Sequence, residues 1–138
     1  LEIARHTWHR WVFLAAGLYN ICWGIYSAID PQWLYRFAGM PPARYPEIFA
    51  CLGMVIGLYG LLYLEVARVP ARGWLMAAVG LIGKILGPIG ATMLILEGQW
   101  PPAAFILCLT NDLIWWMPFG LYLHDAWQPC WKDLRQSS

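Results

Sequence analysis

The chain has 138 residues, of which 60% are hydrophobic and only 12% are charged, and its formal net charge is +1. Soluble domains carry charges on about a quarter of their residues, so this composition excludes a water-facing surface over most of the chain. The near-neutral charge gives no basis for binding nucleic acid. We therefore expect a single all-α transmembrane domain over residues 1–138, with membrane lipids as its main surroundings.

A helix needs about 20 apolar residues to cross the hydrocarbon core, and four segments meet this requirement. They cover about residues 8–29, 47–66, 74–96 and 102–123, and turn-forming residues separate them. The loop after the first span is the longest, and its aromatic segment 31–38 predicts a short helix on the membrane surface. The sequence thus predicts an integral membrane four-helix bundle with a short interfacial segment after helix 1.

The distribution of arginine and lysine predicts the orientation of the bundle, because these residues are enriched in cytoplasmic loops. Two of them, Arg36 and Arg44, flank the spans on one side. The other side collects six: Arg5, Arg10, Arg68, Arg72, Lys132 and Arg135. We therefore expect both termini in the cytoplasm. No signal-peptide pattern precedes the first span, and the start at Leu1 rather than Met is what missing or processed leading residues would give.

Small residues mark the faces along which the helices are expected to pack. In lipid the hydrophobic effect does not drive helices together, so association depends on the close packing that small residues permit. The second span contains Gly53 and Gly57 at a spacing of four. The third span carries four glycines on one helical face: Gly80, Gly83, Gly87 and Gly90. Pro88 in the same span predicts a kink that leaves a main-chain carbonyl near Lys84 without its helical partner.

Two charged residues lie deep in the apolar spans, Lys84 in the third and Asp112 in the fourth. At 1.5 Å per residue both are about 15–17 Å from the cytoplasmic ends of their spans, and Asn20 and Asn111 lie near the same depth. An unpaired charge at the bilayer centre costs about 2.5–3.5 kcal/mol on insertion scales. We therefore expect a buried Lys84–Asp112 ion pair with the two asparagines as hydrogen-bond partners. The pair either binds a ligand or fixes the register of the two helices, and the sequence leaves both interpretations open.

The three histidines are weaker evidence for a functional site than the two charged residues in the spans. His6, His9 and His124 flank the spans at the cytoplasmic interface, where they are the residues that could ligate a metal or a pigment, but ordinary interfacial histidines are the favoured explanation. No metal is therefore predicted. The chain has no nucleophile–base pair and no phosphate-binding loop, so no catalytic residue is predicted and an enzyme is not favoured.

Three stretches are distinctive in the sequence: CLGMVIGLYG at 51–60, VGLIGKILGPIG at 79–90 and TNDLIWWMPF at 110–119. Together with Tyr19-Asn20 and Trp23-Gly24 they resemble a family of small, uncharacterised four-helix bacterial membrane proteins, over residues 18–123. Some members carry the label alkyl hydroperoxide reductase. Peroxide reduction by thiols requires an accessible thiolate, and three of the four cysteines of this chain lie in apolar segments. The resemblance therefore implies the fold and a location in the bacterial cytoplasmic (inner) membrane, and little about activity.

Two functions are consistent with these features. The first is an accessory or structural subunit of a larger bacterial membrane complex, respiratory or photosynthetic, because the chain is small and its loops are short. Its partners would be other membrane subunits or further copies of the chain in a homo-oligomer. The alternative is a small carrier or ligand-binding membrane protein that uses the polar site at the bilayer midplane. A bound lipid, a quinone or a pigment at the helix surface are the cofactors considered, and the sequence identifies none of them.

Overall fold

The computed structural model describes residues 2–137, and this part of the chain is helical with no strand. Four helices are long and apolar enough to cross a membrane, which confirms the predicted all-helical class with four span-sized helices. Their order along the chain, with the short elements between them, is α1 (His6–Ile29), α2 (Trp33–Ala38), α3 (Pro46–Arg68), η1 (Pro70–Arg72), α4 (Trp74–Leu96), η2 (Pro102–Ala104), α5 (Phe105–Cys108), η3 (Leu109–Leu113) and α6 (Ile114–Gln136).

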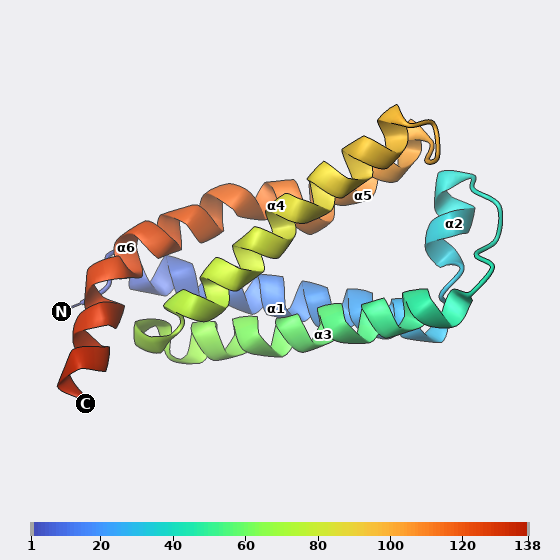
Figure 1. The fold of residues 1–138 in the computed structure, drawn as a ribbon. Coiled ribbons are helices and arrows are strands. Elements are labelled where there is room, and N and C mark those ends of the chain that lie inside the picture. The colour runs from blue at the N-terminus through green and yellow to red at the C-terminus, as the bar shows by residue number, and fades with distance from the viewer. Residues whose placement is uncertain (1, 138) are drawn as a thin grey trace.

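The fourth of these long helices is composite and extends beyond its expected end. It begins with η2 and α5, passes through the π-helical turn η3, and continues as α6 to Gln136, well past the expected limit at Leu123. In Figure 1 the red end of α6 and the N-terminus lie at the same end of the molecule. The two chain ends are therefore close to one end of the bundle, while α2 lies at the opposite end (Figure 1).

The expected short segment after the first long helix is α2, and polar contacts hold it in a tight loop. Gly39 ends the helix with a positive φ of 69°, a conformation that glycine adopts without strain. The side chain of Gln32 bonds twice to the main chain of Ala43, at 2.9 and 3.2 Å. Arg36 pairs with Asp30, and this hydrogen bond lowers the pKa of the Asp30 carboxyl from its ordinary value.

Helices α1 and α3 form the most extensively packed pair and lie side by side along their length (Figure 1). Glycines make this possible. A Cβ atom on Gly24 would lie only 2.5 Å from the main-chain oxygen of Gly53, and one on Gly60 would lie 2.6 Å from the oxygen of Gly17. Gly57 lies at the same interface, with the Cα of Gly24 as its nearest neighbour. The backbones therefore touch directly, as small residues permit in lipid.

Helix α4 packs on α6 and diverges from α3 with distance from the chain ends, as its diagonal course in Figure 1 shows. Gly80 lies under Tyr63, where a Cβ would come within 2.5 Å of the phenol oxygen, and Gly87 lies beside Asp112. Gly83 and Gly90 have no neighbour within 4 Å of an added Cβ. The expectation that all four glycines of this helix serve close packing is therefore not met by Gly83 and Gly90, because the helix has already moved away from α3.

An aromatic core joins the α1–α3 pair to α6 near the end that carries the termini. The rings of Phe13 and Phe119 are 4.5 Å apart, and Tyr122 and Tyr63 meet this pair edge-on at 4.8 and 5.0 Å. All four side chains are buried. Edge-to-face contacts of this kind add to the stabilisation from burial alone. The core thus fixes α6 against the glycine-packed pair and leaves the opposite end of the bundle more open.

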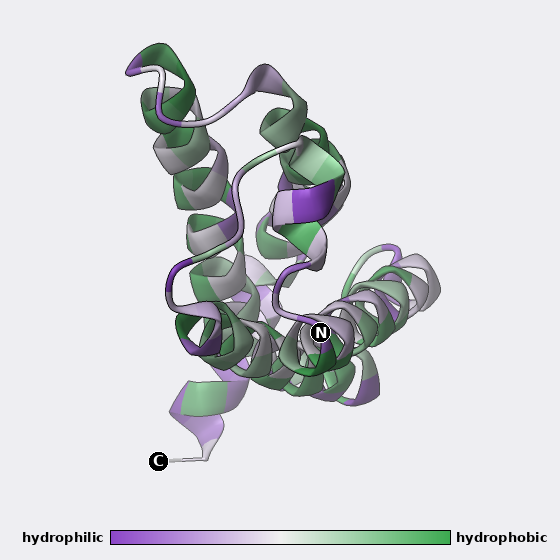
Figure 2. Cartoon of the chain, turned by 90° about the vertical axis from the view of Figure 1, so that its right-hand side faces the viewer, coloured by the Kyte–Doolittle hydropathy of each residue, from purple (hydrophilic) through white to green (hydrophobic). Residues whose placement is uncertain are grey.

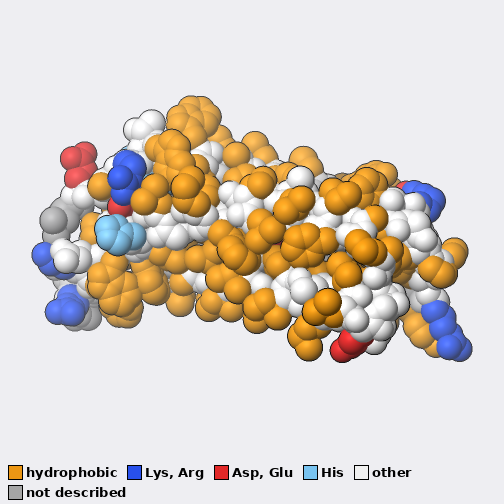
Figure 3. Space-filling view, turned by 90° about the horizontal axis from the view of Figure 1, so that it is seen from above, with side chains coloured by type: hydrophobic (Ala, Val, Ile, Leu, Met, Phe, Trp, Pro, Cys, Tyr) orange, Lys and Arg blue, Asp and Glu red, His pale blue; other side chains and the backbone are white. Residues whose placement is uncertain are grey.

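The outer surface is apolar along the bundle. Figure 2 shows hydrophobic residues along every long helix, and Figure 3 shows hydrophobic side chains over the middle of the visible face with charged side chains toward its two ends. Large apolar residues such as Leu96, Ile29 and Met117 are highly exposed. An apolar surface along all four long helices is compatible with a multi-pass membrane protein.

Candidate functional site

A cavity of about 370 Å³ opens where α4 diverges from α3. Its size falls in the range of small-molecule sites, which is about 300–1,000 Å³. Side chains of α1 and α3 form an apolar wall, and glycines of α4 form the facing wall. All four polar residues selected from the sequence line this one cavity: Asn20, Lys84, Asn111 and Asp112.

Lys84 contacts the fourth long helix through a main-chain oxygen. Its Nζ donates a hydrogen bond to the carbonyl oxygen of Asn111, 2.6 Å away. Asn111 belongs to η3, where the π-helical turn changes the regular pattern of main-chain hydrogen bonds, and such turns are frequent at functional sites. The side chain of Lys84 is therefore held by the backbone of η3.

The main chain of Lys84 contacts the same helix. Pro88 lies four residues further along α4 and has no N–H, so the Lys84 carbonyl lacks its helical partner. The indole Nε1 of Trp116 donates to this oxygen at 2.9 Å. Pro88 was predicted to leave a carbonyl near Lys84 open, and Trp116 of α6 bonds this carbonyl. The hydrogen bond connects the Pro88 turn of α4 to α6.

Aromatic rings surround the Lys84 ammonium group. Its Nζ lies 5.6 Å from the ring centre of Tyr63, 5.8 Å from that of Phe119 and 5.9 Å from that of Trp115. Only 6% of the residue is exposed. Cations within about 6 Å of a ring face are attracted by its quadrupole, and the attraction is stronger away from water. The lysine is thus stabilised by three rings and one carbonyl.

Asp112 lies in the same cavity without contacting Lys84. No salt bridge joins the two residues, and the carboxylate accepts no hydrogen bond from any residue in the range 2–137. Its Oδ2 lies 3.0 Å from the position of an added Cβ on Gly87. The expected ion pair is therefore not a direct contact, and the ammonium group lies instead within hydrogen-bonding distance of the main-chain oxygen of Asn111. The carboxylate stays available at the cavity wall.

The two asparagines bond elsewhere than to the charged groups. Asn20 Nδ2 donates to the main-chain oxygen of Ile56 at 3.4 Å and so connects α1 to α3. The side-chain oxygen of Asn111 accepts a hydrogen bond from the hydroxyl of Tyr19, which also lies 3.3 Å from Thr110 Oγ1. Tyr19 was not predicted as a site residue, because a tyrosine in an apolar span carries no charge. Its position next to Asn20 was the available clue.

A second polar cluster ties α1 to α6 near the chain ends. His9 is completely buried, and its Nε2 lies 2.8 Å from Asp125 Oδ2. Arg5 donates to both oxygens of the same carboxylate, at 2.9 and 2.7 Å, while His124 lies 3.3 Å from it. Asp125 was not predicted as a site residue. Its position directly after the fourth span and beside His124 was the signal that could have identified it.

The three histidines that were considered as metal ligands, His6, His9 and His124, lie in different surroundings. His6 takes no part in the Asp125 cluster, and His124 is exposed. Across residues 2–137 no group of three His, Cys, Asp or Glu side chains is placed to hold a metal ion. The three histidines therefore do not form a common site, because burial directs His9 to Asp125. The four cysteines are free, and none of them lines the cavity.

The whole chain was compared with known proteins. Protein-family models, curated proteins and solved structures each gave no match. The resemblance to small bacterial membrane proteins therefore stays a prediction from the residues.

Proposed function

We propose that this chain is a multi-pass protein of the bacterial cytoplasmic membrane, with both termini in the cytoplasm, that binds a small amphipathic ligand in the cavity around Lys84 and Asp112. The observation that carries the proposal is the Asp112 carboxylate, which has no hydrogen bond or salt bridge to the described residues and lies in the wall of a cavity of about 370 Å³. Small-molecule sites have this character: mostly apolar walls with a few polar groups that fix orientation.

The chemistry of the wall defines the ligand. A carboxylate in apolar surroundings is costly unless a donor satisfies it, so the ligand should carry a hydroxyl or amine group that donates to Asp112. Leu52, Val55 and Ile56 provide an apolar surface for a ring or short chain. A hydroquinone head group combines these features, because it has two hydroxyl donors on a flat apolar ring. A lipophilic quinol is therefore the ligand class that fits best.

The experiment measures binding of duroquinol to the purified protein in mild detergent by quenching of tryptophan fluorescence. We expect saturable binding to the wild type and at least tenfold weaker binding to Asp112→Asn, which keeps the shape and loses the charge. Asp133→Asn is the matched control, because Asp133 pairs with Arg72 on the surface, away from the cavity. Equal duroquinol affinity of the folded Asp112→Asn variant and the wild type, or absence of binding to both, would overturn the proposal.

A second candidate is the accessory subunit of a larger membrane complex. The observation that favours it is the open space beside Gly90 on α4, which has room for a helix of another subunit. The test is the size of the protein extracted from its native membrane in mild detergent. Migration with larger chains would support this function, whereas a colourless monomer or small homo-oligomer would contradict it.

A further inference from the structure

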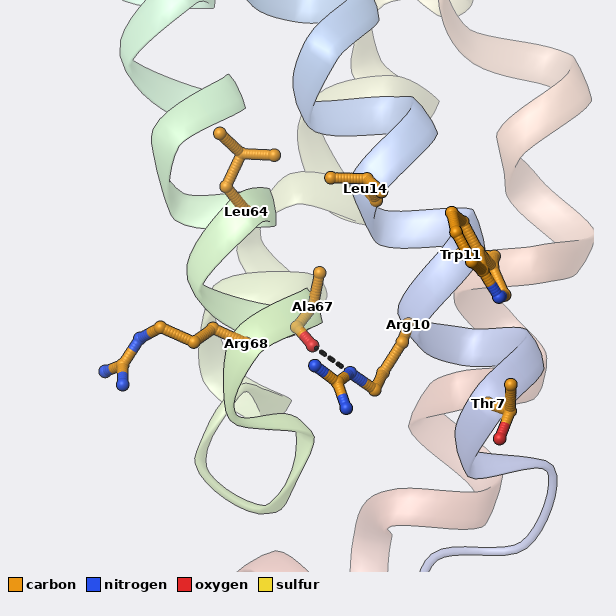
Figure 4. A pocket seen from close by; sticks show the side chains of 7 residues that line it. All are labelled: Thr7, Arg10, Trp11, Leu14, Leu64, Ala67 and Arg68. Atoms are coloured by element: carbon orange, nitrogen blue, oxygen red, sulfur yellow. Dashed lines mark hydrogen bonds between the residues drawn. The ribbon is translucent and has the colours of Figure 1, made fainter.

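A second cavity, of about 600 Å³, lies between α1 and α3 at the end that carries the chain termini. Its lining residues come from the first turns of α1 and the last turns of α3, as Figure 4 shows. It shares no lining residue with the cavity around Lys84. The two cavities are therefore separate, and an inference about this one does not depend on the ligand proposed above.

Arg10 supplies an available positive charge at this second cavity. Its Nε donates to the main-chain oxygen of Ala67 at 2.9 Å, which fixes the guanidinium against the end of α3 (Figure 4). A guanidinium has five N–H donors, so four remain for another acceptor. Arg5, Arg68 and Arg72 each pair with a carboxylate, whereas Arg10 pairs with none among the residues described.

The neighbours of Arg10 change from polar to apolar with depth. Thr7 lies one turn nearer the chain end, and Trp11, Leu14 and Leu64 lie beside Arg10 or deeper in the bundle. Trp11 is 66% exposed, and tryptophan is enriched at the boundary between head groups and acyl chains. In Figure 4 the side chain of Arg68 points away from Arg10. The guanidinium of Arg68 donates to the carboxylate of Glu65. The guanidinium of Arg10 thus lies next to an apolar surface formed by Leu14 and Leu64.

We propose that this cavity binds one anionic phospholipid of the surrounding bilayer. The phosphate accepts hydrogen bonds from the free N–H groups of Arg10, and an acyl chain lies over Leu14 and Leu64. Arginine suits this role because its planar fork matches two phosphate oxygens. The uncompensated charge of Arg10 favours a head group with a net negative charge over a zwitterionic one.

The experiment uses native mass spectrometry of the detergent-purified chain titrated with phosphatidylglycerol or phosphatidylcholine. We expect one tightly retained phosphatidylglycerol on the wild type and at least tenfold weaker retention on Arg10→Gln. Arg72→Gln removes the same charge at the same end of the bundle outside the cavity, and it should retain the lipid as the wild type does. Equal retention of phosphatidylglycerol by Arg10→Gln and the wild type would refute the site.

A second variant protects the test from a loss of folding, because Arg10 also bonds to Ala67. Leu14→Trp keeps the guanidinium and fills the apolar part of the cavity, so it should weaken phosphatidylglycerol retention while α1 stays helical. Displacement of the lipid by millimolar inorganic phosphate would show a site for free phosphate and would overturn the lipid assignment. Duroquinol binding in the other cavity should be unchanged in both variants, so the two proposals fail separately.

Discussion

The Nζ atom of Lys84 lies 2.6 Å from the main-chain oxygen of Asn111, across the contact between α4 and η3. This hydrogen bond directs the ammonium group to the main chain of η3, and no salt bridge joins it to Asp112. Lys84 therefore connects two helices, while Asp112 lines the same cavity with no hydrogen bond or salt bridge to any of residues 2–137. The two charges have different structural settings, and their substitutions should have different consequences.

Lys84→Met should destabilise the protein more than Asp112→Asn does. The methionine keeps most of the volume and removes a hydrogen bond from a charged donor, which contributes about 1.5–3 kcal/mol. Asp112→Asn removes no hydrogen bond that the described structure contains. Thermal unfolding in detergent, followed by circular dichroism, measures both. Equal destabilisation by the two variants would mean that Lys84 and Asp112 act as one ion pair in the membrane protein.

Trp116→Phe should cost stability only while Pro88 is present. In the wild type the indole bonds the Lys84 carbonyl that the proline leaves open, and an unsatisfied buried acceptor costs about 1–3 kcal/mol. In the Pro88→Ala background the alanine supplies an N–H to that carbonyl, so the indole matters less. A double-mutant cycle of unfolding free energies measures this coupling. Additive costs would show that the indole acts by packing alone.

Gly24→Ala should weaken the α1–α3 pair, whereas Gly90→Ala should not. The methyl group at position 24 would come within 2.5 Å of the Gly53 oxygen, and overpacking of this kind costs about 1–3 kcal/mol. At position 90 there is open space, and alanine is the better helix former by up to about 1 kcal/mol. Unfolding in detergent with increasing sodium dodecyl sulfate compares them. A loss for Gly90→Ala in native membranes alone would reveal a neighbouring subunit at this glycine.

Asp125→Asn should loosen the start of α1. The Asp125 side chain is only 4% exposed and bonds both Arg5 and the buried His9, and hydrogen bonds to charged groups contribute about 1.5–3 kcal/mol. Asp133→Asn is the control, because the exposed Arg72–Asp133 pair should contribute less than about 1 kcal/mol. Hydrogen exchange of the first turn of α1 locates the effect. Unchanged protection of that turn in Asp125→Asn would show that the aromatic core alone holds α1 to α6.

Much of the candidate site could be predicted from single residues. Charged side chains in apolar spans are expensive, so Lys84 and Asp112 stand out in the sequence, and helical rise places them at one depth. Pro88 likewise predicts an open carbonyl. The partner of that carbonyl, Trp116, was not predictable, because any of several aromatic residues on the fourth span could have reached it.

The sequence by itself determined the four apolar helices and some of the glycines on which helices approach, such as Gly53 and Gly80, because these follow from local composition and the helical period. Only the tertiary structure decided that α1 and α3 form the close pair, that α4 diverges and opens the cavity, and that His9 is buried on Asp125. It also decided that Lys84 bonds the Asn111 oxygen and not the Asp112 carboxylate. The physical reason is that these contacts depend on crossing angles and on the π-helical turn of the backbone, which the pattern of side chains along one helix does not specify.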